Sequence, residues 1–479
     1  MQTQYEDFIG GRFVQSSAAS IDVSNPANLD FLTRIPNSTP STVAAAVQAA
    51  RDAQPAWAKI PAIQRAAALR RISAKVREHR ERLARIITQE QGKVLSLAQV
   101  EVDFTADYID YMAEWARRIE GEVLTSDRAG ESIFLLRKPV GVIGGILPWN
   151  FPFFLIARKM APALITGNTV VIKPSEVTPV NAFEFAKLVA ETDLPAGVFN
   201  LVGGDGPNTG AALASSPGIN MVSFTGSVET GARIMELAAR NLTRVNLELG
   251  GKAPAIVLAD ADLDLAIKAI RDSRIINTGQ VCNCAERVYV ERPVAERFIE
   301  GVSKAMAATR SGDSLADPTV EMGPLVNQEG LDKVEGILRR AKASGVETLI
   351  GGTRATAVGK GFFFEPTVLL SKSNDTEVMR QEIFGPVLPI HVVDSMEEAI
   401  AKANDSEYGL TSSIFTQNLN KAMQAVRDLQ FGETYVNREH FEAMQAFHAG
   451  RRKSGIGGAD GKHGLYEHTE TQVVYINHG

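Results

Sequence analysis

Cysteine is the residue that this chain almost lacks, since its 479 residues contain two, Cys282 and Cys284. Thiols two positions apart do not pair with each other easily and there is no third cysteine, so a disulfide framework is excluded. The two residues also cannot complete a zinc site by themselves. Each thiol is therefore either an inert packing group or a reactive nucleophile, and the polar loop around them is compatible with both.

Long apolar runs and a strong charge of either sign are also missing. The longest apolar stretch, 140–147, is far shorter than the roughly 20 residues of a membrane span and ends at Pro148. A net charge of −6 gives no electrostatic reason to expect nucleic acid as a partner. Residues 1–11 carry Glu6 and Asp7 and no basic segment, unlike a secretory signal. Together with the shortage of cysteine, these features predict a cytoplasmic protein with no membrane partner.

Strands that alternate with helices dominate what is present. Apolar residues at helical spacing predict helices between 41 and about 120. Strand-like runs then alternate with amphipathic segments over 141–249 and again from 251 to about 470, which predicts βαβ units, parallel sheets and an α/β fold. Residues 132–137 are predicted to form a strand that faces an earlier one across the turn at 127–130, and 471–477 to form an isolated strand. This protruding hairpin and the C-terminal strand have edges that need a partner. They would pair either with another subunit or within the chain.

Parallel sheets bind ligands where their strands end, so the turns after the predicted strands hold the first candidates. Gly226 and Ser227 follow a strand at 221–224. Their turn could offer N–H groups to a phosphate, or it could be a close-packed turn. Lys173 ends a strand at 169–173, and Glu176 lies in the turn after it. They could bind the hydroxyls of a ribose, or they could be a solvated lysine and a helix-start glutamate.

Two further turns hold candidate catalytic groups. Asn150 lies between two prolines that fix the backbone, so its amide could donate to a developing oxyanion. The alternative is a turn asparagine that bonds its own backbone. Glu248 lies between two leucines, and partial burial predicts a raised pKa and a role as general base. An ion-paired glutamate is the alternative.

Taken together, these segments resemble the NAD(P)-dependent aldehyde dehydrogenase superfamily. The resemblance runs in order along nearly the whole chain, through 148–150, 173–176, 224–227, 248–252, 279–282 and 382–387. It implies a Rossmann-type NAD-binding domain at 1–120 and 140–249, and an α/β catalytic domain at 250–466. It also implies a small β oligomerisation unit at 121–139 and 467–479, and a homotetramer built as a dimer of dimers.

The resemblance assigns the catalytic roles to four residues. Cys282 matches the nucleophile that attacks the aldehyde carbonyl, and Asn150 matches the amide that holds the oxyanion together with the Cys282 N–H. The adduct is a thiohemiacetal, which becomes a thioester when its hydride passes to nicotinamide. Glu248 matches the base that activates the hydrolytic water, and Lys159 matches a lysine that joins the proton relay.

NAD is the cofactor that the resemblance implies, with no metal. Glu382 and Phe384 match the residues beside the nicotinamide ribose and ring, and Ser227 matches a pyrophosphate contact. Lys173 and Glu176 match the pair on the adenosine ribose, where a carboxylate opposes the 2′-phosphate of NADP. The other members of the predicted cofactor site are Ile146, Leu147, Pro148, Trp149, Ser175, Gly226, Thr230 and Leu249.

The predicted substrate tunnel departs from relatives that act on apolar aldehydes, whose tunnels are aromatic. Phe151 keeps an aromatic ring, but Arg158, Asn283, Glu442 and His448 place polar groups there. Such groups would bind a hydroxyl and would be left unpaired by an alkyl aldehyde, unless some of them point to solvent. The pattern resembles the branch of the family that acts on lactaldehyde and glycolaldehyde.

Several alternatives stay open. One is another substrate class, such as succinate semialdehyde or betaine aldehyde. Another is a CoA-acylating variant, against which Glu248 argues because transfer to CoA needs no strong base. A third is a non-enzymatic scaffold, against which the intact set of catalytic residues argues. Lys462 stands where many relatives have a glutamate that assists deacylation, which leaves Glu248 as the one carboxylate candidate for the base.

Overall fold

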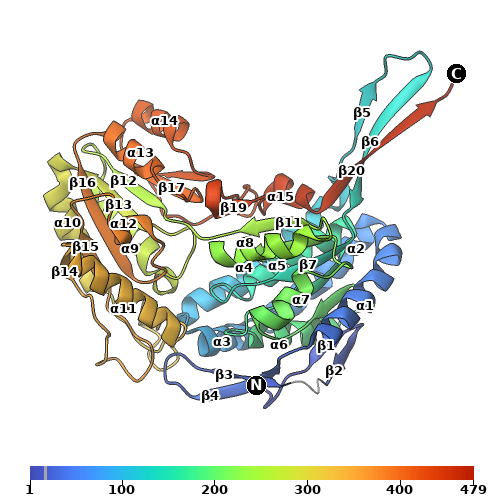
Figure 1. Ribbon diagram of the computed structural model, residues 1–479, viewed down its shortest axis with the longest axis horizontal. Helices are drawn as coiled ribbons and strands as arrows, with labels where there is room; N and C mark the ends of the chain where they lie inside the picture. Colours follow the sequence, from blue (N-terminus) through green and yellow to red (C-terminus); the bar gives the residue numbers. More distant parts are fainter. Residues whose placement is uncertain (16–18) are drawn as a thin grey trace.

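Two sheets with parallel central strands organise the chain in the computed structural model, which describes residues 1–15 and 19–479. Each sheet forms the centre of one lobe, and a three-stranded arm projects from the first lobe and carries the C-terminus (Figure 1). The predicted α/β fold is confirmed.

The first sheet has the strand order of a Rossmann unit. Its order is β19 (Gly455–Ile456), β11 (Arg244–Glu248), β10 (Met221–Thr225), β7 (Val142–Ile146), β8 (Thr169–Lys173), β9 (Phe199–Leu201), β1 (Asp7–Ile9) and β2 (Arg12–Val14). Strands β7 to β11 run parallel, whereas β1 and β19 pair antiparallel with them. The chain order reverses between β7 and β10, and such a switch point is where this kind of sheet binds its ligand.

Helices cover both faces of this sheet because alternate strand residues point to opposite sides. Val142, Val171 and Val222 pack with α1 (Pro40–Lys59), α7 (Ala211–Ala214) and α8 (Val228–Ala239). Ile143 and Ile172 pack on the other face, within the core that includes the following helices: α2 (Ala62–Glu78), α3 (Arg80–Gln91), α4 (Leu95–Ala113), α5 (Phe154–Thr166) and α6 (Val180–Ala190).

The second sheet repeats the principle with other elements. Its order is β14 (Glu347–Ile350), β15 (Thr367–Leu370), β16 (Val387–Val393), β13 (Arg287–Glu291), β12 (Pro254–Val257), β17 (Thr411–Phe415) and β18 (Glu433–Val436), and β14 is its antiparallel strand. The helices of this lobe are α9 (Leu263–Ile275), α10 (Arg292–Ala307), α11 (Gln328–Ala343), α12 (Glu377–Arg380), α13 (Met396–Asn404) and α14 (Leu419–Asp428).

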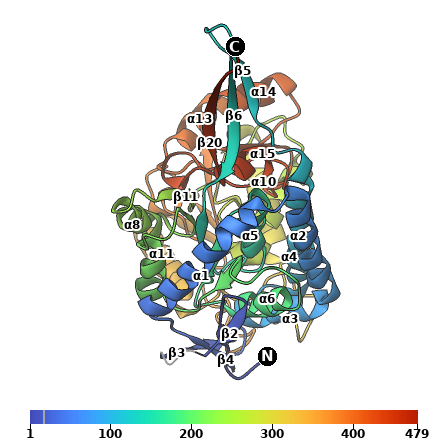
Figure 2. The same ribbon diagram turned by 90° about the vertical axis from the view of Figure 1, so that its right-hand side faces the viewer.

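The arm contains the predicted hairpin and the predicted C-terminal strand. Strand β20 (Thr469–Asn477) pairs antiparallel with β6 (Glu131–Pro139) along its whole length, and β6 pairs with β5 (Glu122–Thr125). The predicted C-terminal strand therefore packs within the chain, and the arm rises above both lobes (Figure 2). Helix α15 (Gly461–Glu467) leads into β20, and β3 (Ser20–Ser24) and β4 (Phe31–Pro36) form a separate ribbon.

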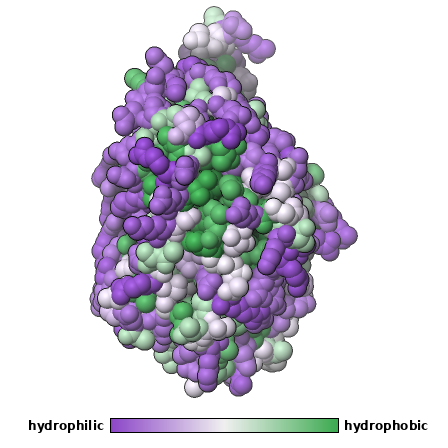
Figure 3. Space-filling model, turned by 90° about the vertical axis from the view of Figure 1, so that its left-hand side faces the viewer, coloured by the Kyte–Doolittle hydropathy of each residue, from purple (hydrophilic) through white to green (hydrophobic). Residues whose placement is uncertain are grey.

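The outer surface is mostly hydrophilic on the side of the second lobe, where apolar side chains gather near the centre of the face (Figure 3). Across residues 1–15 and 19–479, no helix is both long enough and apolar enough to cross a membrane.

Candidate active site

The candidate site lies where the two sheets approach each other end to end. Glu248 and Thr225 are the last residues of β11 and β10, so the first sheet contributes its carboxyl ends. Cys282 lies in the loop just before β13, so the second sheet contributes its amino ends. Thr411, the first residue of β17, donates from its hydroxyl to the Asn283 carbonyl at 2.8 Å and holds this loop on the second sheet.

The loop that carries Cys282 is held in a strained conformation. Asn277, Thr278 and Gly279 have φ angles of 48°, 60° and 73°, and the left-handed region is costly for a β-branched threonine. The Thr278 hydroxyl donates to the Gly323 carbonyl at 3.0 Å, and the Gln280 side chain accepts from the Val326 N–H at 2.9 Å. These bonds fix the backbone that presents the cysteine.

The two cysteines have different surroundings. Cys284 is buried, its thiol donates to the Val281 carbonyl at 2.9 Å, and burial raises its pKa to about 12. Cys282 is partly exposed and lines a cavity of about 70 Å³. Cys284 is therefore the packing thiol, and Cys282 is the one that a substrate can reach.

His448 lies near the Cys282 thiol, and it does not line the cavity itself. Its Nδ1 lies 2.5 Å from Oε1 of Glu433, the first residue of β18. Burial opposes a charge on His448, but the neighbouring Cys282, Glu433 and Glu442 raise its pKa well above the usual value. Burial raises the pKa of Cys282, and the imidazolium opposes that rise. Sequence reasoning missed Glu433.

Glu248 is held between two cations. Its Oε1 accepts from Lys159 Nζ at 3.0 Å, and its Oε2 lies 3.6 Å from Arg158 Nη1 and accepts from the Thr225 hydroxyl at 3.3 Å. Burial opposes ionisation, but Lys159 and Arg158 outweigh it and lower the pKa of Glu248 to about 2. The predicted rise in pKa is therefore wrong. Burial lowers the pKa of Lys159 although Glu248 stabilises its charge.

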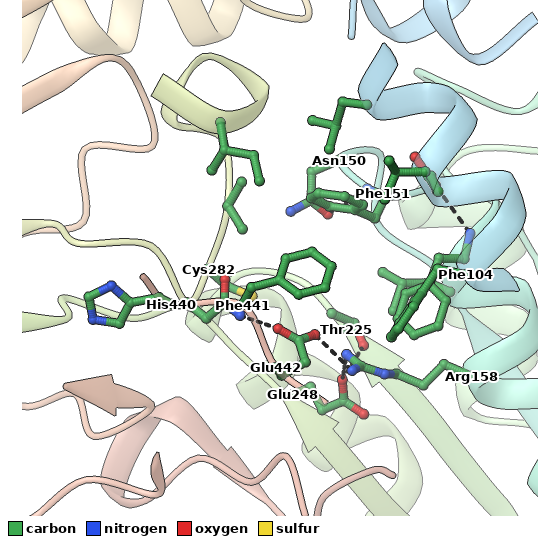
Figure 4. Close-up of a pocket in the computed structure, with 18 residues that line it drawn as sticks. Phe104, Asn150, Phe151, Arg158, Thr225, Glu248, Cys282, His440, Phe441 and Glu442 are labelled. Carbon is green, nitrogen blue, oxygen red and sulfur yellow. Dashed lines mark hydrogen bonds and ion pairs between the residues drawn. The ribbon is translucent and has the colours of Figure 1, made fainter. Parts of the chain in front are cut away.

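Arg158 connects most of the polar groups in the cavity. Its guanidinium donates to both carboxylate oxygens of Asp460, at 3.1 and 2.5 Å, and to Glu442 at 2.9 Å. Glu442 also accepts from the Asn283 amide, so it lies between the cysteine loop and Arg158 (Figure 4). Sequence reasoning missed Asp460, because nothing in its glycine-rich surroundings indicates a buried carboxylate.

Asn150 faces the same loop. Its side-chain amide donates to the Gln280 carbonyl at 3.0 Å, and its Oδ1 accepts from the Phe151 N–H at 3.1 Å. Its own carbonyl accepts from the Asn277 amide at 3.0 Å. The amide thus lies beside the cysteine loop, where the predicted oxyanion role requires it.

The cavity beside Cys282 brings together most of the predicted catalytic and substrate residues. Its polar lining includes Asn150, Arg158, Glu248, Asn283 and Glu442. Its aromatic lining consists of Phe104, Phe151, Phe154 and Phe441. Lys159 and His448 lie behind this lining. Lys159 donates to Glu248 at 3.0 Å, and His448 lies near Cys282. The cavity is therefore small, with aromatic walls and a charged, hydrogen-bonding floor.

Two larger cavities lie at the switch point of the first sheet. One of about 380 Å³ reaches Cys282 and contains seven predicted cofactor residues: Pro148, Trp149, Gly226, Ser227, Leu249, Glu382 and Phe384. The other, of about 680 Å³, is lined by Ile146 and Thr230 among others. The linings of both leave out Leu147, Lys173, Ser175 and Glu176.

These cavities suit a dinucleotide. Ser227 caps α8 by accepting from the Thr230 N–H, so the positive end of that helix faces the cavities, as a pyrophosphate requires. Burial raises the pKa of Glu382 to about 7, and a ribose hydroxyl could satisfy this buried carboxyl group. Lys173, the last residue of β8, and Glu176 form an ion pair at 2.8 Å. Within residues 1–15 and 19–479, no cluster of three His, Cys, Asp or Glu side chains could hold a metal ion.

Comparison with known proteins decides the family. Residues 13–474 match the Aldehyde dehydrogenase family. The chain is 57% identical over 474 residues to lactaldehyde dehydrogenase of Escherichia coli (strain K12). The aligned residues make up 99% of this chain and 98% of the relative. The crystal structure of the Escherichia coli enzyme matches with a TM-score of 0.98 over 99% of both chains. This chain belongs to the aldehyde dehydrogenase family.

Other aldehyde dehydrogenases similar to this one differ in cofactor. D-glyceraldehyde dehydrogenase (NADP+) of Thermoplasma acidophilum is 37% identical over 480 residues, 98% of this chain and 96% of that one. Betaine aldehyde dehydrogenase of Staphylococcus aureus, solved in complex with NAD+, is 34% identical with a TM-score of 0.97 over 99% of this chain and 95% of that chain. The family therefore uses NAD or NADP.

Proposed function

We propose that this aldehyde dehydrogenase oxidises small hydroxyaldehydes, glycolaldehyde and lactaldehyde first, to carboxylic acids with NAD. The observation that carries this proposal is the polar floor of the 70 Å³ cavity, where Arg158, Glu442 and Asn283 form one hydrogen-bonded chain beside Cys282. A hydroxyl next to the aldehyde carbon can join this chain. An alkyl group there would keep water from the remaining donors and acceptors of these groups and would offer no hydrogen bond in its place.

The same contacts argue against a carboxylate-bearing substrate such as succinate semialdehyde. Asp460 binds the Arg158 guanidinium in a bidentate manner, and Glu442 binds it as well. Arg158 is therefore already neutralised, and Glu442 would repel a second carboxylate in so small a cavity. The name of the Escherichia coli relative, lactaldehyde dehydrogenase, supports the hydroxyaldehyde assignment.

Addition to the aldehyde is the step that the cysteine loop serves. The His448 imidazolium stabilises the Cys282 thiolate, which attacks the carbonyl carbon and forms a thiohemiacetal. The Asn150 amide, now bonded to the Gln280 carbonyl, and the Cys282 N–H would take the oxyanion. NAD, when bound, accepts the hydride whose loss leaves a thioester on Cys282.

Hydrolysis of the thioester then needs a base, and Glu248 is the candidate. A carboxylate whose pKa is about 2 is a weak base, because Lys159 and Arg158 stabilise its charge. Glu248 would accept a proton from the water that attacks the thioester once Lys159 has passed its own proton to a solvent water. Burial lowers the pKa of Lys159 and so favours that transfer. Lys159 thus belongs in the proton relay.

Three further assignments belong to the same proposal. Glu176 opposes a 2′-phosphate, which favours NAD over NADP. The domain boundaries predicted above place the cofactor on the first lobe and the nucleophile on the second, and the arm carries subunit association in a tetramer. A cytoplasmic location stays a prediction from the cysteine content.

The test of the reaction class is NADH formation from glycolaldehyde without CoA. Steady NADH formation over many turnovers is expected, because Glu248 lets water release the acid. A single burst equal to the enzyme concentration would instead indicate a CoA-acylating enzyme, and no NADH at all would indicate a non-enzymatic protein. The variant Cys282→Ala should bind NAD and form no NADH.

A further inference from the structure

A fully buried ion pair lies behind the predicted oxyanion donor. The side chains of Lys93, in the turn between α3 and α4, and Glu101, on α4, are both 0% exposed, and Lys93 Nζ lies 2.5 Å from Glu101 Oε2. Neither residue belongs to the catalytic set above, and Glu101 is one of the residues that line the cavity beside Cys282. Burying two such charges costs several kcal/mol per ion in desolvation, so the pair by itself is a weak source of stability. Its remaining contacts show what it holds.

Lys93 contacts the backbone and side chain of the segment that carries the oxyanion donor. Its Nζ donates to the Asn150 carbonyl at 2.9 Å and lies 3.5 Å from the centre of the Phe151 ring. One cation therefore fixes the peptide of Asn150 and the neighbouring aromatic wall of the substrate cavity.

Glu101 holds the start of the next helix. Its Oε1 accepts from the N–H groups of Phe153 and Phe154, at 2.9 and 3.1 Å, in the first turn of α5. A carboxylate there satisfies two of the free N–H groups of the helix and suits its positive end. Helix α5 carries Arg158 and Lys159. The two charges together span the backbone from Asn150 to the base of that helix.

The same support reaches the cysteine loop. A Cβ placed on Gly323 would lie 1.9 Å from the carbonyl oxygen of Gly92, the residue before Lys93. The backbones at Gly92 and Gly323 are therefore in close contact. Gly323 in turn accepts from the Thr278 hydroxyl at 3.0 Å. The lysine that holds Asn150 and the loop that presents Cys282 therefore rest on one rigid segment.

We propose that Lys93 and Glu101 form a positioning pair that fixes the Asn150 amide relative to the Cys282 thiol for addition to the aldehyde. Neither residue touches the reacting atoms, and the proposal rests on the oxyanion role of Asn150. A displacement of about 1 Å between a donor and a reacting group can cost two orders of magnitude in rate.

The test removes both charges together, since losing one partner would leave the other buried and unpaired. In Lys93→Met/Glu101→Gln, the rate constant of the first NADH burst with glycolaldehyde and saturating NAD should fall about tenfold or more. Asn150→Ala alone should slow this burst by about 100-fold or more. In the Asn150→Ala background, the pair of substitutions should slow it by less than about twofold, because the group that they position is gone.

Glu90→Gln is the matched control. Glu90 is also buried, and it caps the first turn of α6 by accepting from the N–H groups of Val180 and Asn181 at 2.6 and 2.8 Å. Its substitution should lower the melting temperature and leave the burst rate within about twofold.

Two results would overturn the proposal. One is an unchanged NADH burst rate in the double variant. The other is a double variant that slows the burst equally with and without Asn150. The control Asn150→Ala separates this failure from a failure of the proposed mechanism. If Asn150→Ala leaves the burst unchanged, the oxyanion assignment is wrong. If the double variant still slowed the burst, it would do so without acting through Asn150, and the positioning role would be wrong as well.

Discussion

At the scale of single residues, the site is a set of buried charges whose neighbours set their protonation. Glu248 is the clearest case, because burial predicts a raised pKa while Lys159 and Arg158 lower it to about 2. The sequence shows that Glu248 lies between two leucines. It does not show that two cations from α5 lie opposite, because that contact joins residues about 90 positions apart.

The base assignment predicts a separation of the two half-reactions. Glu248→Gln keeps the shape of the side chain and removes its ability to accept a proton. The first NADH burst should remain, and the steady-state rate with glycolaldehyde should fall about 100-fold or more, as for loss of a general base. Rapid mixing resolves both phases. An unchanged steady-state rate would assign the base elsewhere.

The position of His448 near Cys282 predicts a change in thiol titration. The rate of Cys282 alkylation by iodoacetamide rises with pH as the thiolate forms. Because the His448 imidazolium stabilises the thiolate, His448→Phe should move the midpoint of this curve to higher pH. Carboxylates that face His448 are Glu433 and Glu442, and Glu248, Asp460 and Arg158 lie in the same network.

His440→Phe is the matched control for that titration. His440 lines the cavity beside Cys282, but burial lowers its pKa to about 3, so it is neutral at pH 7. Its replacement should leave the midpoint in place. A midpoint that stays unchanged in His448→Phe as well would show that the thiol is activated without the imidazole.

The polar floor predicts the effect of removing one amide. In Asn283→Ala, Glu442 keeps its bond to Arg158, so the remaining charges stay paired. The ratio of kcat/KM for glycolaldehyde to kcat/KM for acetaldehyde should fall about tenfold, because one partner of the substrate hydroxyl is lost. An unchanged ratio would place the hydroxyl away from Asn283.

At the scale of elements, most strands of the two sheets were predictable because they are short apolar runs bounded by turns, whereas β14, β15 and β19 were not predicted. Helix α5 was not predicted. Every residue of α5 is buried and Pro162 lies inside it, so it shows no amphipathic period. This omission is important for function, because α5 carries Arg158 and Lys159 and both charges point into the site.

Helix α9 ends just before the loop that carries Cys282, and its stability can be measured separately from the chemistry. Asp262 caps this helix by accepting from the Leu265 N–H at 3.1 Å. Asp262→Ala should lower the free energy of unfolding by about 1 kcal/mol in urea titrations, whereas Asp262→Ser should keep most of it. Equal losses in both variants would show that the cap is not what the aspartate contributes.

At the scale of the whole molecule, function depends on two lobes meeting with opposite strand ends. The sequence indicated which turns of the first sheet carry ligands, since its carboxyl ends follow a general rule. It gave no sign that the amino ends of the second sheet face them. Glu433 on β18 and Asp460 before α15 therefore joined the site unexpectedly, and so did the pair formed by Lys93 and Glu101.

The proposed role of the arm in subunit association can be tested on its exposed apolar residues. Val123 on β5 and Tyr475 on β20 are 73% and 66% exposed, on a sheet whose outer strands have free edges. Val123→Glu/Tyr475→Glu should shift the mass measured by light scattering toward smaller species, because charges oppose edge pairing. Leu29→Glu, an exposed apolar residue between β3 and β4, is the control and should leave the mass unchanged. An unaltered mass in the double variant would place the interface elsewhere.

The central claim is that this aldehyde dehydrogenase selects a hydroxyl beside the aldehyde. The most direct measurement is kcat/KM with NAD for two aldehydes of equal chain length, glycolaldehyde and acetaldehyde, on the unmodified protein. The polar floor formed by Arg158, Glu442 and Asn283 predicts a preference for glycolaldehyde of about 100-fold or more. Equal values, or a preference for acetaldehyde, would contradict the account.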